Sequence, residues 1–170
     1  MTNIIKAMNP TATLTTEPEA LAAARVSAVG IVIGAVHQAV GAWYATTPEA
    51  AAAAAAMVEE LTGQTSDPAA LAQQSQMGLM FGGGLILLAL ILAVVQWRKP
   101  NTVLPILFLV LVVWSLGGAV LALTVPALSG SQPMWLTLFS LVTMAIAAIM
   151  HVASIRGVSA LNRIRMAAAQ

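Results

Sequence analysis

The sequence predicts an all-α integral membrane protein, a bundle of four transmembrane helices. Of its 170 residues, 59% are hydrophobic and only 8% are charged, and the mean hydropathy is +0.90. A soluble domain carries about 25% charged residues, so this chain has too few charges to cover a surface that faces water. The sequence also contains four apolar stretches of about 20 residues, the length that a helix needs to cross a bilayer core of about 30 Å. These spans cover about residues 26–45, 77–97, 103–125 and 134–155.

Capping patterns predict helices that begin outside the spans. Thr16 and Glu19 have the spacing of a capping box, so the first helix is expected to start about two turns before its span. Threonine–proline and aspartate–proline pairs at 47–48 and 67–68 predict a short helical hairpin over about residues 46–76, on the outer side of the membrane. The sequence thus predicts one membrane domain, 16–165, between a flexible tail (1–15) and a C-terminal tail (166–170).

The distribution of charge predicts the orientation. With alternating spans, one side of the membrane carries all seven basic residues, which are Lys6, Arg25, Arg98, Lys99, Arg156, Arg163 and Arg165. The opposite loops carry no lysine or arginine and four of the six acidic residues. Because lysine and arginine accumulate on the cytoplasmic side, both termini are expected in the cytoplasm and the protein in the inner (plasma) membrane of a bacterium. The basic residues 156–165 are then expected to anchor this topology rather than to form a specific lipid site.

A cleaved signal peptide is the competing interpretation of the first span. Such a peptide has a basic start, a short apolar core and an early cleavage site. Here the apolar stretch begins only after residue 25, follows Glu17 and Glu19, and is long enough to cross the membrane. The sequence therefore favours a retained transmembrane helix.

Several classes of chemistry are excluded or disfavoured. The chain contains no cysteine, which excludes disulfides, thiolate metal sites and cysteine nucleophiles. A net charge of +1 gives no reason to expect nucleic acid. No phosphate-binding loop, HExxH, nucleophile elbow or dinucleotide fingerprint is present. No Asp, Glu, Lys or Arg lies within a span, which weakens the case for a proton-coupled transporter.

Small and polar residues recur every three or four positions along three of the spans. Residues at this spacing share one helix face, and small residues allow membrane helices to approach closely. Two pairs of glycines, 30 with 34 and 78 with 82, match GxxxG. The residues expected to pack helices together are Gly30, Gly34, Gly41, Gly78, Gly82, Ser115, Ser140 and His151.

The two histidines lie at different depths in the predicted spans. At about 1.5 Å per residue, His37 lies about 16 Å from the inner edge of its span and His151 about 6 Å. A haem bound by both histidines would need its two axial ligands at nearly the same depth in the membrane, so the difference in depth disfavours this arrangement. Met144 lies at about 16 Å, which leaves a haem b held by His37 and Met144 as an alternative. A neutral histidine hydrogen-bonded to Ser115 or Thr143 between two helices is the favoured interpretation.

These observations favour a non-enzymatic protein without a cofactor that works by helix–helix association. Its expected partners are the lipid bilayer and other membrane subunits or a second copy of the chain. Two alternatives stay open: a small b-type cytochrome or quinone-linked membrane anchor, and a channel or transporter subunit.

Overall fold

The computed structural model describes residues 4–65, 67–124 and 132–170, and within them the chain forms helices and no strands. In chain order the helices are α1 (Ile4–Met8), α2 (Glu17–Tyr44), α3 (Pro48–Thr62), α4 (Pro68–Arg98), α5 (Val103–Thr124) and α7 (Met134–Ala168). Four of them, α2, α4, α5 and α7, are long and apolar enough to cross a membrane. The all-helical, multi-pass class predicted from the sequence is therefore confirmed.

Capping residues set the helix starts. The Thr16 side chain accepts a hydrogen bond from the Glu19 backbone N–H, and Glu19 reaches back to the N–H of Thr16, which confirms the capping box. Thr47 and Asp67 cap α3 and α4 by accepting hydrogen bonds from the backbone N–H groups of Ala50 and Ala69, and each is followed by proline in the first turn. These side chains satisfy backbone donors that a helix start leaves unpaired.

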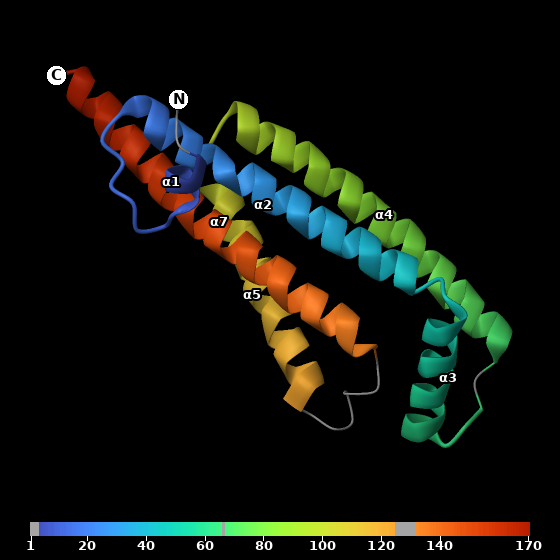
Figure 1. Ribbon diagram of the computed structural model, residues 1–170. Helices are drawn as coiled ribbons and strands as arrows, with labels where there is room; N and C mark the ends of the chain where they lie inside the picture. The colour runs from blue at the N-terminus through green and yellow to red at the C-terminus, as the bar shows by residue number, and fades with distance from the viewer. Residues whose placement is uncertain (1–3, 66, 125–131) are drawn as a thin grey trace.

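The long helices form an open row rather than a closed bundle (Figure 1). The central pair is α2 and α7; α4 packs chiefly on α2, and α5 packs chiefly on α7. The loop 99–102 joins α4 to α5 at the end of the molecule that carries both termini, which we call the basic end, and the two helices diverge from there. The predicted count of four long helices is confirmed. Because α4 and α5 diverge from their short connecting loop, they do not pack against each other along their lengths.

The end opposite the basic end is loosely packed. Helix α3 has no buried residue and makes its contacts with α4. An open groove of about 900 Å³ lies between α3 and the first turns of α4. Alanines of α3 and aliphatic residues such as Val58, Leu71 and Leu79 line this groove.

Residues 4–15, part of the segment 1–15 that the sequence predicts to be a flexible tail, fold back onto the basic end. Ala7 of α1 is buried against Ala23, Val26 and Met150 of α2 and α7. Lys6 Nζ lies 2.6 Å from Glu19 Oε1. This apolar contact and this ion pair hold residues 4–15 in place, and both link residues too far apart in sequence for helical periodicity to indicate them.

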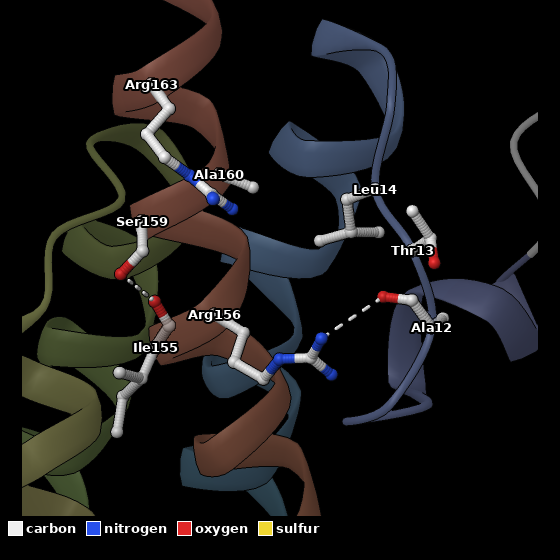
Figure 2. Close-up of a pocket in the computed structure, with 8 residues that line it drawn as sticks. All are labelled: Ala12, Thr13, Leu14, Ile155, Arg156, Ser159, Ala160 and Arg163. Atoms are coloured by element: carbon white, nitrogen blue, oxygen red, sulfur yellow. Dashed lines mark hydrogen bonds between the residues drawn. The ribbon is translucent and has the colours of Figure 1, made fainter.

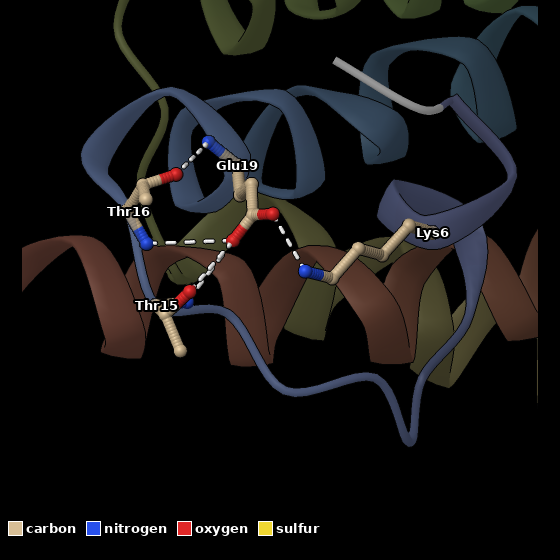
Figure 3. A network of polar contacts seen from close by, with 4 residues as sticks. All are labelled: Lys6, Thr15, Thr16 and Glu19. Atoms are coloured by element: carbon tan, nitrogen blue, oxygen red, sulfur yellow. Dashed lines mark hydrogen bonds and ion pairs between the residues drawn. The ribbon is translucent and has the colours of Figure 1, made fainter.

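Glu19 is the centre of this contact (Figure 3). Its carboxylate accepts hydrogen bonds from Lys6 Nζ and from the backbone N–H groups of Thr15 and Thr16. The hydrogen bond from Lys6 contributes most to lowering the pKa of Glu19 from its ordinary 4.5 to about 2, and the backbone donor of Thr15 contributes next. The ionised carboxylate is thus the form that holds the segment.

Acid is therefore expected to release the N-terminal segment. Because the folded pKa lies below the unfolded value, the contribution of Glu19 to stability is complete above about pH 4.5 and is lost as the pH falls towards about 2. A spin label at Thr11→Cys, in this cysteine-free chain, should become mobile over that interval. In Glu19→Gln the label should already be mobile at pH 7. Equal mobility of the parent at pH 6 and pH 2 would contradict this role.

Candidate functional site

The interface between α2 and α7 contains most of the buried polar groups of the described residues. Five polar side chains are buried, and four of them, Ser27, Thr137, His151 and Ser154, belong to these two helices, while Gln96 comes from α4. The small-residue pattern of the sequence places Ser27, Gln96 and Ser154 on the faces expected to be internal. The geometry divides the interface into a tightly packed half at the basic end and a wider half beyond it.

The closest approach in the tight half is at Gly157. An added Cβ would lie 2.6 Å from the carbonyl carbon of Ala23 and 2.8 Å from its Cβ, so the backbones of α2 and α7 are in direct contact. Gly157 lies just beyond the predicted fourth span (134–155), in the part of α7 that continues to Ala168. Ala153, Gly157 and Ala160 are all buried and recur at steps of four and three. This spacing of small residues is the signal that could have indicated the contact.

A polar cluster next to it joins three helices. The Ser154 hydroxyl donates to the Ala24 carbonyl at 2.6 Å. The amide of Gln96 donates to the same carbonyl at 3.1 Å and to the carbonyl of Asn101 at 3.2 Å. Asn101 in turn caps α5 through the N–H of Leu104. The cluster fixes the basic ends of α2, α4 and α7 relative to one another and to the loop 99–102.

His151 lies in the tight half and is fully buried, with an exposed fraction of 0%. Its Nδ1 is 2.7 Å from the Ser27 hydroxyl, and its ring stacks on Phe108 of α5 at 6.0 Å between centroids. Among the described residues its Nε2 has no hydrogen-bond partner. The tautomer with the proton on Nδ1 is favoured, because the other would bury an unpaired N–H.

The full burial of His151 is not expected from its depth alone, about 6 Å from the inner edge of the predicted span. The first turns of α2 and the segment 4–15 extend past the predicted span and cover this part of α7. Gly30 also packs here, with an added Cβ 3.2 Å from His151 Cε1 and 3.3 Å from Met150 Cβ. Of the predicted packing residues, Gly30 and His151 therefore meet directly.

His37 makes the equivalent bond in the wider half. Its Nε2 lies 2.8 Å from the Ser140 hydroxyl, and its ring stacks on Phe139 at 6.0 Å. The partner expected from the sequence was Ser115 or Thr143. Ser115 is exposed on α5, and the Thr143 hydroxyl donates to the carbonyl of Phe139 in its own helix.

Four predicted packing glycines make no close contact within the described part of the chain. An added Cβ at Gly34, Gly41, Gly78 or Gly82 would meet nothing within 4 Å. In the wider half, large rings set the distance between α2 and α7, since His37 and Phe139 stack and Tyr44 meets Trp135 at 6.2 Å. Helix α4 buries only Ala93 and Gln96, near the basic end, so its glycines lie beyond its tight contact with α2.

Met144 belongs to a hydrophobic cluster that includes residues of α5. It is buried with Val112 and Ala147 where α5 packs on α7. His37 already has a hydrogen-bond partner on α7. These two placements favour packing roles over the haem alternative.

The two serine–histidine pairs are not arranged for nucleophilic catalysis. Ser27 and His151 are both fully buried, so a substrate has no access to them. No described carboxylate contacts either histidine to orient it as a catalytic triad requires. The described residues also contain no group of three or more His, Cys, Asp or Glu that could hold a metal ion. The pairs can donate and accept hydrogen bonds between helices.

Comparison of the chain with protein-family models, with curated proteins and with solved structures finds no match.

Proposed function

We propose that the protein is a non-enzymatic multi-pass membrane protein that acts by helix–helix association. It serves as an accessory or structural subunit of a larger membrane complex or as a homo-oligomer. The observation that carries this proposal is that α4 and α5 each pack along one neighbour and leave exposed glycines, such as Gly84 and Gly118, with no close neighbour among the described residues.

The free face of α5 has the composition of a helix contact. Ser115, Gly117 and Gly118 are exposed there, and an added Cβ at either glycine would meet nothing within 4 Å in the described residues. Trp114 is 83% exposed beside them, near the middle of the span. Glycine and a hydroxyl group make no favourable interaction with lipid tails. Against a second helix, glycine allows close packing and the hydroxyl can form a hydrogen bond.

Helix α4 has a similar feature in the run 82–84. All three positions are glycine, and none has a neighbour within 4 Å of an added Cβ among the described residues. Large apolar side chains surround them, including Met80, Phe81, Leu87 and Leu88. Together α4 and α5 offer two separate faces, one on each side of the central pair.

Cross-linking from single cysteines tests the proposal, because the parent chain has no cysteine. Gly84→Cys and Gly118→Cys, treated in native membranes with a thiol cross-linker, should give products of defined mass. A product of twice the chain mass indicates a homo-oligomer, and any other mass identifies a subunit. Ala119→Cys is the matched control, since Ala119 adjoins Gly118 but is buried within the chain. An absence of products from both glycine positions would refute association through these faces.

The proposed location is the inner membrane of a bacterium with both termini in the cytoplasm. The distribution of all seven basic residues to one side supports it. Reporter fusions after Gln170 and after Pro100 should report the cytoplasm, and a fusion near Gln64 should report the outside. A C-terminal fusion that reports the outside would contradict the orientation.

A further inference from the structure

A pocket of about 250 Å³ lies at the basic end between the N-terminal segment and α7 (Figure 2). Ala12, Thr13 and Leu14 form one wall, and Arg156, Ser159 and Arg163 line the other. Figure 2 shows the Arg156 side chain extending across towards Ala12 and the Arg163 side chain running along α7 towards Ala160. Two guanidinium groups and a hydroxyl therefore border one small space.

Among the described residues, the arginines of this pocket have no carboxylate partner. Of the acidic residues near this end, Glu17 pairs with Arg165 at 2.8 Å and Glu19 pairs with Lys6 at 2.6 Å. The remaining four acidic residues belong to the segment 49–67, at the opposite end. Within the described residues, Arg156 donates only to the Ala12 carbonyl, at 3.4 Å. The pocket thus has a positive charge that no protein carboxylate offsets.

The predicted end of the fourth span puts the pocket near the level of lipid headgroups. Ile155 ends the apolar span, and Arg156 follows it directly. The Cα of Arg163 is about 10 Å further along the helix, beyond a headgroup layer of about 5–8 Å, but its side chain runs back along α7 towards Ala160 (Figure 2). Leu14, Ile155 and Ala160 add aliphatic surface to the same pocket.

We propose that this pocket binds a phosphate group presented by an anionic phospholipid of the adjacent leaflet. Guanidinium groups match phosphate oxygens in geometry and charge, and basic pockets at the cytoplasmic side of membrane proteins hold anionic headgroups. The aliphatic part of the lining favours a lipid over free phosphate, because inorganic phosphate gains nothing from Leu14 or Ile155. The site is separate from the association faces of α4 and α5, so either proposal can fail alone.

The test measures binding to the full chain purified in a neutral detergent. Three probes are compared: short-chain phosphatidylglycerol, short-chain phosphatidylcholine and inorganic phosphate. Binding is followed by native mass spectrometry and by the shift in thermal midpoint, which a ligand of the folded state raises. We expect one molecule of phosphatidylglycerol to bind tightly to each chain, and the other two probes to bind at least tenfold more weakly.

Variants separate the pocket from general positive charge. Arg156→Gln combined with Arg163→Gln should weaken the binding of phosphatidylglycerol at least tenfold. The control, Arg98→Gln combined with Lys99→Gln, removes the same charge from the end of α4 and the adjoining loop and should change this binding less than twofold. Ser159→Glu places a carboxylate three and four residues from the two arginines, where it supports the helix and should also abolish binding. The proposed site would be overturned if the control variant lost as much affinity for phosphatidylglycerol as the pocket variants. Unchanged binding in Ser159→Glu would also overturn it. Inorganic phosphate that binds as tightly as the lipid would overturn the lipid as its source.

Discussion

Replacing Gly157 by alanine is expected to destabilise the protein by about 3 kcal/mol, the upper part of the usual cost of overpacking. The added methyl group would lie 2.6 Å from the carbonyl carbon of Ala23, and closer still to the backbone nitrogen of Ala24. A flexible side chain could rotate away, but backbone atoms of a packed helix cannot. Helices α2 and α7 must therefore separate, which also stretches the bonds of Ser154 and Gln96 to the Ala24 carbonyl.

The measurement is the free energy of unfolding in mixed detergent micelles, with Gly34→Ala as the control. Gly34 is on the same helix pair, but an added Cβ there meets no described atom within 4 Å. Since alanine stabilises a helix interior by about 0.5–1 kcal/mol relative to glycine, Gly34→Ala should be neutral or slightly stabilising. Equal stability of Gly157→Ala and the parent would show that α2 and α7 do not approach so closely.

Features that depend on local sequence could be predicted from it. Span length follows from the run of apolar residues, and helix starts follow from side chains that bond their own backbone, as at Thr16 and Asp67. Which small residue lies at a helix contact depends on the neighbouring helix. The GxxxG pair of Gly78 and Gly82 therefore gave no contact within the described chain, whereas Gly157, outside any such motif, makes the closest one.

The positions of the polar residues also depend partly on local sequence and partly on neighbouring helices. Periodicity placed Ser140 on an inner face, where it bonds His37. Depth along one helix did not indicate the burial of His151, because that burial depends on Ser27 and Gly30 of α2 and on Phe108 of α5. The open arrangement of α4 and α5 was likewise not predictable, since each span has the same hydropathy whether lipid or protein covers it.

Replacing His151 by leucine is expected to destabilise the protein by about 1.7 kcal/mol, the largest value typical of a hydrogen bond within the membrane. The ring is fully buried, and its loss leaves the Ser27 hydroxyl, also fully buried, without this partner. His37→Leu should cost only about 0.6 kcal/mol, the average for such a bond, because His37 is partly exposed. This ranking is the reverse of the one that depth alone predicts.

A double-mutant cycle isolates the bond from the change in shape. If Ser27 and His151 act through their hydrogen bond, Ser27→Ala should cost little once His151→Leu is present. His37→Gln, which keeps a hydrogen-bonding group near Ser140, should be nearly silent. Additive losses in the cycle would mean that the His151 ring stabilises the protein through packing against Phe108 alone.

The same variants separate packing from haem ligation at His37. Under the packing interpretation, protein purified after haem-replete expression shows no Soret absorption, and His37→Gln changes neither spectrum nor stability. Iron ligation would instead require both His37 and Met144, so His37→Gln and Met144→Leu would each alter a Soret band. The bond of His37 to Ser140 and the burial of Met144 against α5 favour the first result, because each side chain is already engaged in a different helix contact.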